Sequence, residues 1–440
     1  MNPSIRPRER EAILQSLRAG VVPSIGLQHI QVGRKAEVAA VLNDLALVEE
    51  SGASVRFIIG RFGAGKSFFL NLARMVALER RFVVVQADIT PDRRLHASGG
   101  QARGLFAELM QNMAVRSQPT GGALPVVVER WVSDVNHEVQ LAGGTDAEVA
   151  RRIHERLQPL HDMVGGFDFA TILTRYFEGF QQSNAVLMES ALRWLRAQYT
   201  TRTDARADLG VRAIIDDEVI YEYLKLLAAF VRLAGHAGLL VNLDEMGVLS
   251  HRLNHQQARN ANYEVILRIV NDCLQGNTSG IGFLFSGTDT FLDDQRRGLA
   301  SYEALATRLA ENRFAANGLA DFSGPIIRLA NLSVEDLYVL LHRIRDVFAR
   351  GDSSAYLVPD EGITAFITYC SQTLGAEFFR TPRDAVKGFV GLLSVLEQNA
   401  DADWRALLET TTLEQTSDPD LSGPPDDDQT ANGDLATFRL

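Results

Sequence analysis

The sequence predicts an α/β fold in which a parallel β-sheet is covered by helices. Five short apolar segments have the length of strands, and helical patterns separate them along the chain. Strands that are apolar on both faces are typical of parallel sheets buried between helices, and these segments are of that kind. The five segments are residues 55–59, 82–87, 239–243, 281–286 and 326–329.

The first part of the chain alternates helices and strands. Apolar residues recur at helical spacing in residues 35–49, and Gly20 is placed to end the helix before it. The first strand is apolar apart from Arg56, and the second ends at Asp88. The elements expected here are helices at residues 8–17, 35–49 and 67–78 and strands at residues 55–59 and 82–87.

The middle of the chain is predominantly helical. Helical patterns run from about residue 105 to residue 234 and include residues 106–113 and 185–199. Only residues 124–128 have some strand character, and a strand there remains an open alternative. Because strand signals return at residue 239, this stretch is expected to be a long helical insertion into the sheet domain.

The segment after the last strand predicts a C-terminal helical lid. Ser333, followed three residues later by Asp336, resembles a capping box that opens a helix reaching Phe348, and more helices follow to about residue 410. Residues 415–433 are rich in Asp, Pro, Gly and Ser and are expected to be disordered. The expected units are N-terminal helices at 1–50, the first half of the sheet domain at 51–104, the insertion at 105–235, the second half of the sheet domain at 236–330, the lid at 331–411 and an acidic tail at 412–440.

Composition indicates a soluble globular protein of the cytoplasm. The 440 residues are 46% hydrophobic and 22% charged, and no apolar run reaches the roughly 18 residues that span a bilayer. The first residues are basic, but no apolar stretch follows them, so they do not read as a secretory signal. Cys273 and Cys370 are too few and too far apart for a disulfide framework or a zinc site, which fits a reducing compartment.

The net charge of −11 argues against indiscriminate coating of DNA, which depends on Lys and Arg. Residues 412–440 hold seven carboxylates against Arg439, so this tail supplies six of the eleven negative charges. The rest of the chain is only mildly acidic and leaves room for a local basic patch, although a solvated helix face is the commoner explanation for paired arginines. The candidate pairs are Arg93 with Arg94, Arg151 with Arg152 and Arg296 with Arg297.

A glycine-rich loop lies where the first strand should turn into a helix. Residues 60–67 match the pattern G-x-x-x-x-G-K-[ST] in full. Glycines allow positive φ and let backbone N–H groups surround phosphate oxygens, helped by the positive end of the following helix. Lys66 is expected to reach the β- and γ-phosphates of ATP, and the Ser67 hydroxyl to bind Mg²⁺. The nucleotide-binding residues expected here are Gly60, Arg61, Phe62, Gly63, Ala64, Gly65, Lys66, Ser67 and Phe68.

The third apolar segment ends in two carboxylates. Asp244 is expected to complete the Mg²⁺ shell, and Glu245 to orient and deprotonate the attacking water. A Glu directly after this Asp is typical of P-loop ATPases that carry an additional strand and a catalytic glutamate. The sequence therefore favours hydrolysis of ATP over binding alone.

Three further residues indicate an AAA+ arrangement, a P-loop sheet with a helical lid. Ser286 ends the fourth segment, where AAA+ proteins carry the sensor 1 side chain, and Thr288 is the alternative. Arg308 follows at the place of the arginine finger that acts on a neighbouring subunit. Arg383 begins a lid helix and resembles sensor 2. An ordinary strand end or a surface salt bridge is the alternative role for each.

A short box precedes the glycine-rich loop. Val32, Gly33 and Arg34 are similar to the V-G-R box of origin-recognition and STAND-type ATPases, where the backbone and the Arg lie near the adenine and the ribose. Gly33 lies 27 residues before Gly60, with a predicted helix between them. This spacing supports the same role here.

Taken together, these segments resemble the BREX-system ATP-binding protein family BrxD, found in bacterial anti-phage islands. The features specific to this family are the N-terminal run Ala-Gly-Val-Val-Pro and the insertion with Trp194, because the loop and the Asp-Glu pair occur in many ATPases. The resemblance covers roughly residues 8–410 and implies an AAA+ fold and a role in phage defence beside a large helicase. The matching text lies at residues 17–23, 32–34, 60–67, 93–95, 193–196, 209–212 and 238–245.

Three functions remain open on the sequence. The first is an ATP-driven switch or motor in a defence complex, assembled as a homo-oligomer so that Arg308 reaches the next subunit. The second is a nucleotide-gated scaffold that recruits a helicase or methyltransferase with little turnover. The third is a helicase loader or initiator-like protein that binds DNA, although the winged helix that origin-recognition relatives add after the lid has little room here.

Overall fold

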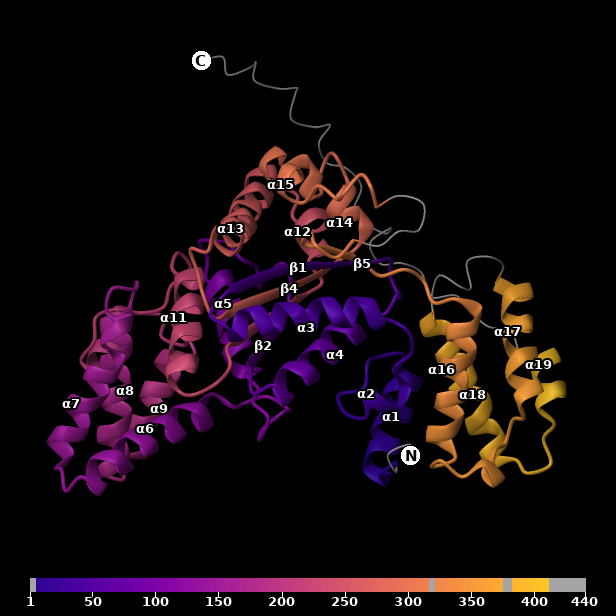
Figure 1. The fold of residues 1–440 in the computed structure, drawn as a ribbon, viewed down its shortest axis with the longest axis horizontal. Coiled ribbons are helices and arrows are strands. Elements are labelled where there is room, and N and C mark those ends of the chain that lie inside the picture. The colour runs from indigo at the N-terminus through magenta and orange to yellow at the C-terminus, as the bar shows by residue number, and fades with distance from the viewer. Residues whose placement is uncertain (1–4, 316–320, 375–381, 411–440) are drawn as a thin grey trace, which may run out of the picture.

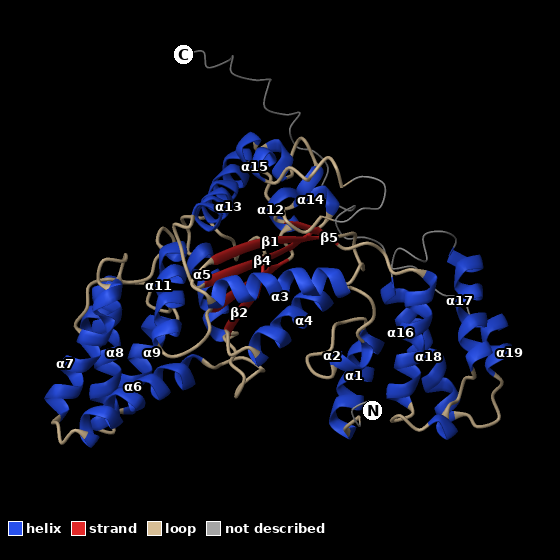
Figure 2. Cartoon of the chain, in the orientation of Figure 1, coloured by secondary structure: helices blue, strands red, loops and turns tan. Residues whose placement is uncertain are grey.

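The computed structural model describes residues 5–315, 321–374 and 382–410. Its centre is a five-stranded sheet in the order β2-β3-β4-β1-β5, in which every neighbouring pair of strands is parallel (Figure 2). The strands are β1 (Ala53–Ile59), β2 (Val83–Asp88), β3 (Leu239–Asp244), β4 (Ile281–Gly287) and β5 (Ile326–Arg328). All five predicted strands are present, and the predicted α/β class is confirmed in a form consistent with a P-loop AAA+ fold.

The strand β4 lies between β1 and β3, although it follows both along the chain. In register, Phe57 of β1 lies opposite Phe285 of β4. Since these strands run in the same direction, their carboxyl ends meet at one edge of the sheet. The residues that follow Ile59, Asp244 and Gly287 are thereby brought together, as in P-loop proteins with an additional strand.

Helices cover both faces of the sheet (Figure 1). One face packs against α3 (Lys35–Glu49) and α4 (Lys66–Glu79) through Ile58, Val84 and Leu240. These side chains alternate along their strands with residues that face the other side, as the period of two in a strand requires. The helix predicted at residues 35–49 is confirmed with the same bounds.

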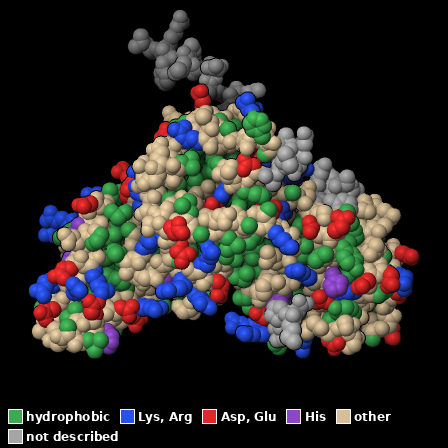
Figure 3. Space-filling model, in the orientation of Figure 1, with side chains coloured by type: hydrophobic (Ala, Val, Ile, Leu, Met, Phe, Trp, Pro, Cys, Tyr) green, Lys and Arg blue, Asp and Glu red, His purple; other side chains and the backbone are tan. Residues whose placement is uncertain are grey.

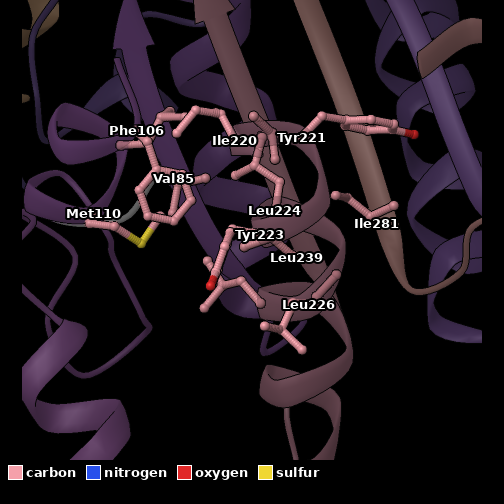
Figure 4. Packing of buried hydrophobic residues seen from close by; sticks show 14 of the residues in the cluster. Val85, Phe106, Met110, Ile220, Tyr221, Tyr223, Leu224, Leu226, Leu239 and Ile281 are labelled. Atoms are coloured by element: carbon pink, nitrogen blue, oxygen red, sulfur yellow. The ribbon is translucent and has the colours of Figure 1, made fainter. Parts of the chain in front are cut away.

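The opposite face of the sheet is buried by helices of the insertion and by α13 (Gln256–Gln275). Figure 4 shows Val85 of β2 in this cluster with Phe106 of α5 (Gln101–Gln111) and the apolar side of α11 (Ile220–Leu233). The insertion therefore shares one hydrophobic core with the sheet.

The connection from β2 to β3 forms this helical insertion, at the left in Figure 1. The open alternative of a strand at residues 124–128 is wrong, because they begin α6 with Pro125 in its first turn. Val127, Val128, Trp131 and Val135 are buried at helical spacing, and this periodicity outweighs the strand preference of valine. The remaining elements are α6 (Leu124–Leu141), α7 (Asp146–Leu157), η1 (Gln158–Leu160), α8 (Gly166–Gln181), α9 (Ala185–Leu195) and α10 (Arg202–Leu209).

The lid follows β5 and lies at the right in Figure 1. Its predicted capping box is present: the Ser333 hydroxyl accepts a hydrogen bond from the Asp336 N–H at 3.0 Å. The N-terminal helices α1 (Pro7–Ala19) and α2 (Leu27–Ile30) pack with the lid, in a cluster that includes Ile13, and not with the sheet. The lid consists of α16 (Val334–Phe348), η3 (Ser353–Ala355), α17 (Asp360–Leu374), α18 (Pro382–Gln398) and α19 (Trp404–Thr410).

Short helices follow the carboxyl ends of β3 and β4. They are α12 (Gly247–His251), α14 (Asp289–Asp293), η2 (Leu299–Ser301) and α15 (Glu303–Arg308). In the part of the chain that the structure describes, no helix combines the length and the apolar character needed to cross a membrane. The tail predicted at residues 412–440 lies outside the described residues.

Candidate nucleotide-binding site

A cavity of about 630 Å³ lies at the carboxyl edge of the sheet. One wall comes from the loop and helix after β1 and from the ends of β2 and β3. The opposite wall comes from the end of α1, from the segment between α1 and α3, and from the lid helices α16 and α18. A ligand in the cavity therefore contacts both the sheet domain and the cluster of α1, α2 and the lid.

The glycine-rich loop has the backbone conformation that its sequence predicts. Gly63 and Gly65 have φ angles of 75° and 89°, which residues with a Cβ adopt only with strain. Gly65 precedes α4, whose first-turn N–H groups have no partner within the helix. Lys66 Nζ donates to the carbonyl groups of Gly60 and Arg61 at 2.9 and 3.0 Å. Residues 62–68 line the cavity, while Gly60 and Arg61 hold the lysine.

The two predicted Mg²⁺ ligands are in direct contact. Ser67 Oγ donates to Asp244 Oδ2 at 2.6 Å and joins the start of α4 to the end of β3. Among the described residues, no three or more His, Cys, Asp or Glu side chains gather into a site that could hold a metal by themselves. Mg²⁺ usually takes one or two protein ligands and completes its shell with phosphate oxygens and water, so this pair fits the ion as part of a complex with ATP.

Glu245 follows Asp244 in a strained backbone conformation. Its φ is 57°, in the left-handed region, which costs a residue other than glycine roughly 1–2 kcal/mol. The Glu245 N–H donates to Asp244 Oδ1 at 2.9 Å, and the Met246 N–H donates to the Ser286 carbonyl at 2.9 Å. These contacts hold the turn that places Glu245 in the cavity wall beside Asp244.

Asp88, Arg93 and Glu108 also line the cavity, and the sequence alone does not mark them as nucleotide-site residues. Asp88 ends β2 and pairs in register with Asp244 of β3. Burial raises the pKa of Asp88, and the Asp244 and Glu108 carboxylates add to this, while Arg93 lowers it. Arg93 pairs with Glu108, with Nη1 and Oε2 2.9 Å apart. The signal that marks Asp88 is the pairing of β2 with β3, which places the polar ends of both strands side by side.

The V-G-R box lies at the opposite wall of the cavity. Val32 and Arg34 line it, and Gly33 between them has a φ of 64°. The Arg34 guanidinium donates to the Ala64 carbonyl at 3.3 Å and to the Ala330 carbonyl at 2.5 Å. Ala64 belongs to the glycine-rich loop, and Ala330 to the connection from β5 to the lid. Arg34 therefore ties the loop to both segments that join the sheet domain to the lid cluster.

Arg383, the predicted sensor 2 residue, reaches from α18 to the loop. Its guanidinium carbon lies 5.6 Å from the centre of the Phe62 ring. Gly20 ends α1 as predicted and has a φ of 69°. It leaves room for this arginine, because a Cβ on Gly20 would lie 2.8 Å from Arg383 Nε. Arg383 lines the cavity, and its contact with a nucleotide stays a prediction.

Ser286, Thr288 and Arg308 do not line the cavity. Ser286 is fully buried in β4, and its hydroxyl has no hydrogen-bond partner. The Thr288 hydroxyl caps α14, where it accepts from the Phe291 N–H at 3.3 Å. Arg308 ends α15 and donates to the Asn271 side chain. A finger acts on the site of another copy, so the role of Arg308 stays a prediction about an assembly.

The basic pairs considered for DNA make local contacts. Arg151 and Arg152 pair with carboxylates of the insertion such as Glu155, and Arg297 donates to a backbone carbonyl. Arg93 faces the nucleotide cavity. On the face shown in Figure 3, acidic and basic side chains are interspersed over the surface. These contacts favour a solvated helix face for Arg151 and Arg152.

The fold and the site define a P-loop nucleotide-binding protein: a parallel sheet with β4 between β1 and β3, and a glycine-rich loop that leads into α4. A family model described as BREX system ATP-binding protein BrxC/D matches residues 5–412. The chain belongs to this family, whose members bind ATP in a defence system, and the predicted resemblance is confirmed at this level. No match to this chain exists among the curated proteins.

Proposed function

We propose that this protein hydrolyses ATP with Mg²⁺ and acts as a switch or motor in a BREX defence complex. The observation that carries the proposal is the 2.6 Å contact between Ser67 and Asp244 beside the strained Glu245, in a cavity lined by the glycine-rich loop. Strained backbone conformations cluster at active sites, and here the strained residue is a carboxylate in the cavity wall beside Asp244.

The residues of the chain divide the task. Lys66 and the backbone N–H groups of residues 63–67 bind the β- and γ-phosphates, and Ser67 and Asp244 would hold Mg²⁺. When bound, the ion would neutralise charge on the phosphate oxygens. Glu245 orients a water molecule and takes its proton while the water oxygen bonds to the γ-phosphorus. The bond from that phosphorus to the bridging oxygen breaks, and the products are ADP and phosphate.

The remaining residues complete the site. Val32, Gly33 and Arg34 hold the adenine and ribose side, and Arg383 senses the nucleotide from the lid. Ser286 is the proposed sensor 1 residue: it does not line the cavity, but its carbonyl accepts from the Met246 N–H next to Glu245, and its buried hydroxyl has no hydrogen-bond partner among the described residues. Arg308 completes the site of a neighbouring copy, so the active form is a homo-oligomer. Mass measurement with and without ATP tests this assembly.

The experiment that tests hydrolysis is the substitution Glu245→Gln. ATP binding should remain intact, and turnover should fall by a factor on the order of 10² to 10⁴, because the amide cannot accept the proton. Glu155→Gln on the insertion is the matched control and should leave turnover unchanged, since that side chain only pairs with surface arginines. Wild-type turnover in Glu245→Gln would contradict the catalytic assignment.

A nucleotide-gated scaffold is the second candidate, and exposed apolar side chains on the insertion favour it. Leu141, Phe167 and Val186 are 75%, 64% and 78% exposed, and such side chains mark a docking site where they form one contiguous patch. Such a scaffold would recruit a helicase or methyltransferase of the same defence system. A steady-state ATPase assay with and without DNA separates the two, because a scaffold stays near background in both conditions.

Within the family, we propose the BrxD type. The support is the run Ala-Gly-Val-Val-Pro at residues 19–23 and the insertion that contains Trp194. The end of this run contributes to the cavity wall through Val21, Val22 and Pro23. A gene for a large helicase beside the coding gene would support this assignment, and its absence would count against it.

A further inference from the structure

Arg93 is a cation in the nucleotide cavity to which the proposed reaction assigns no task. Its side chain lines the same cavity as Lys66 and Asp244. The other two arginines of the described cavity wall come from its lid side, where Arg34 donates to backbone carbonyls and Arg383 lies over the Phe62 ring. Arg93 instead approaches from the end of β2.

The backbone of Arg93 is anchored to the strand that carries the predicted Mg²⁺ ligand. Residues 90–93 form a tight turn in which the Thr90 N–H donates to the Arg93 carbonyl at 2.9 Å and the Arg93 N–H donates back at 3.1 Å. Just before this turn, the Ile89 N–H donates to the Asp244 carbonyl at 3.0 Å. The main chain of Arg93 is therefore fixed beside Asp244, while its long side chain can exchange partners.

The present partner of Arg93 is Glu108 on α5. Nη1 and Oε2 are 2.9 Å apart, and the two side chains are 35% and 31% exposed. An ion pair with this much exposure contributes little to stability, because water solvates the separated groups well. A terminal phosphate presents several oxygens and up to two charges to the fork of a guanidinium, and it is the stronger ligand.

We propose that Arg93 leaves Glu108 when a nucleoside triphosphate enters the cavity, and that it binds the terminal phosphate from the β2 side. ADP has no terminal phosphate, so Arg93 stays with Glu108 when ADP is bound. Arg93 thereby discriminates ATP from ADP within one copy of the chain. Glu108 is a positioning residue that holds the arginine between turnovers. The inference rests on the proposed function, since it requires ATP in this cavity.

The test compares the affinities of the full-length protein for MgADP and for the Mg²⁺ complex of the non-hydrolysable β,γ-imido analogue of ATP, by titration calorimetry. Arg93→Ala should lower the affinity for the analogue by roughly tenfold, the effect of one charge-assisted hydrogen bond, and leave the affinity for MgADP unchanged. Glu108→Gln removes the competing carboxylate charge. It should raise the affinity for the analogue about threefold without affecting that for MgADP. Arg116→Ala is the matched control, because Arg116 pairs with Glu79 on the surface away from the cavity.

The outcomes separate this inference from the proposed function. If Arg93→Ala lowered the affinities for both nucleotides equally, or if Glu108→Gln lowered the affinity for the analogue, the pair would only support the fold. Either result would overturn the inference. If wild-type protein bound neither nucleotide, or if Lys66→Ala bound both as tightly as wild type, the proposed site itself would be wrong. Thermal unfolding of each variant checks that it is folded.

Discussion

The strained backbone at Glu245 allows a test that joins stability to turnover. Glycine accepts a φ of 57° without strain, whereas alanine keeps the Cβ that causes it. Glu245→Gly should relieve roughly 1–2 kcal/mol of left-handed strain. The greater freedom of glycine in the unfolded chain should offset roughly 0.5–1 kcal/mol of this gain. Relative to Glu245→Ala, the glycine variant should therefore be more stable by up to about 1.5 kcal/mol.

Urea unfolding of the two variants side by side measures this difference. Both lack the carboxylate, and both keep the backbone N–H that donates to Asp244, so their comparison isolates the strain. Both should bind ATP and lose turnover by a factor on the order of 10² to 10⁴. A glycine variant less stable than the alanine variant would refute the strain, and wild-type turnover in either variant would refute the catalytic role.

Three other predictions concern the lid, the cysteines and the V-G-R box. Arg345 is 2% exposed and donates to Asp360 at 2.6 Å, so Arg345→Ala should destabilise the lid by about 2–4 kcal/mol in urea unfolding, and an unchanged midpoint would contradict this. Burial raises the pKa of the Cys273 and Cys370 thiols to about 12. The thiolate is the reactive form and appears only as the pH approaches that value. Iodoacetamide should therefore leave both cysteines unmodified in folded protein between pH 7 and 9 but label both in urea. Rapid labelling of folded protein at pH 8 would contradict this prediction. Arg34→Ala should weaken MgATP and MgADP alike by about tenfold in calorimetry, because it removes support for the loop and not a contact to the terminal phosphate; a loss confined to MgATP would exclude that explanation.

Local patterns were enough to predict most elements of the fold. The strands could be predicted because each is an apolar run of strand length, and α3 because its apolar residues recur at helical spacing. The segment at residues 124–128 was ambiguous, since valines favour strands while their spacing favours a helix. The packing of α1 on the lid could not be predicted, because an apolar face with Ile13 and Leu14 does not specify its partner.

The same distinction applies to the candidate site. The glycine-rich loop and the Asp244–Glu245 pair are continuous in sequence, so a motif identifies them. Asp88, Arg93 and Glu108 come together only because β2 lies beside β3 and α5 packs against β2, which brings Glu108 to Arg93. Their relation depends on strand order, which a single sequence does not specify.

The cavity has one wall in the sheet domain and another in the cluster of α1, α2 and the lid. If a nucleotide binds one arrangement of these walls more tightly than another, its affinity depends on how the two walls are positioned. Such linkage is reciprocal. If a partner protein binds the lid more tightly in one nucleotide state by a given factor, it raises the affinity for that nucleotide by the same factor. A tenfold effect corresponds to about 1.4 kcal/mol in either direction. A defence partner that binds only the lid would therefore bind with an affinity that depends on the nucleotide state. It would also change the affinity for the nucleotide, without contacting the nucleotide.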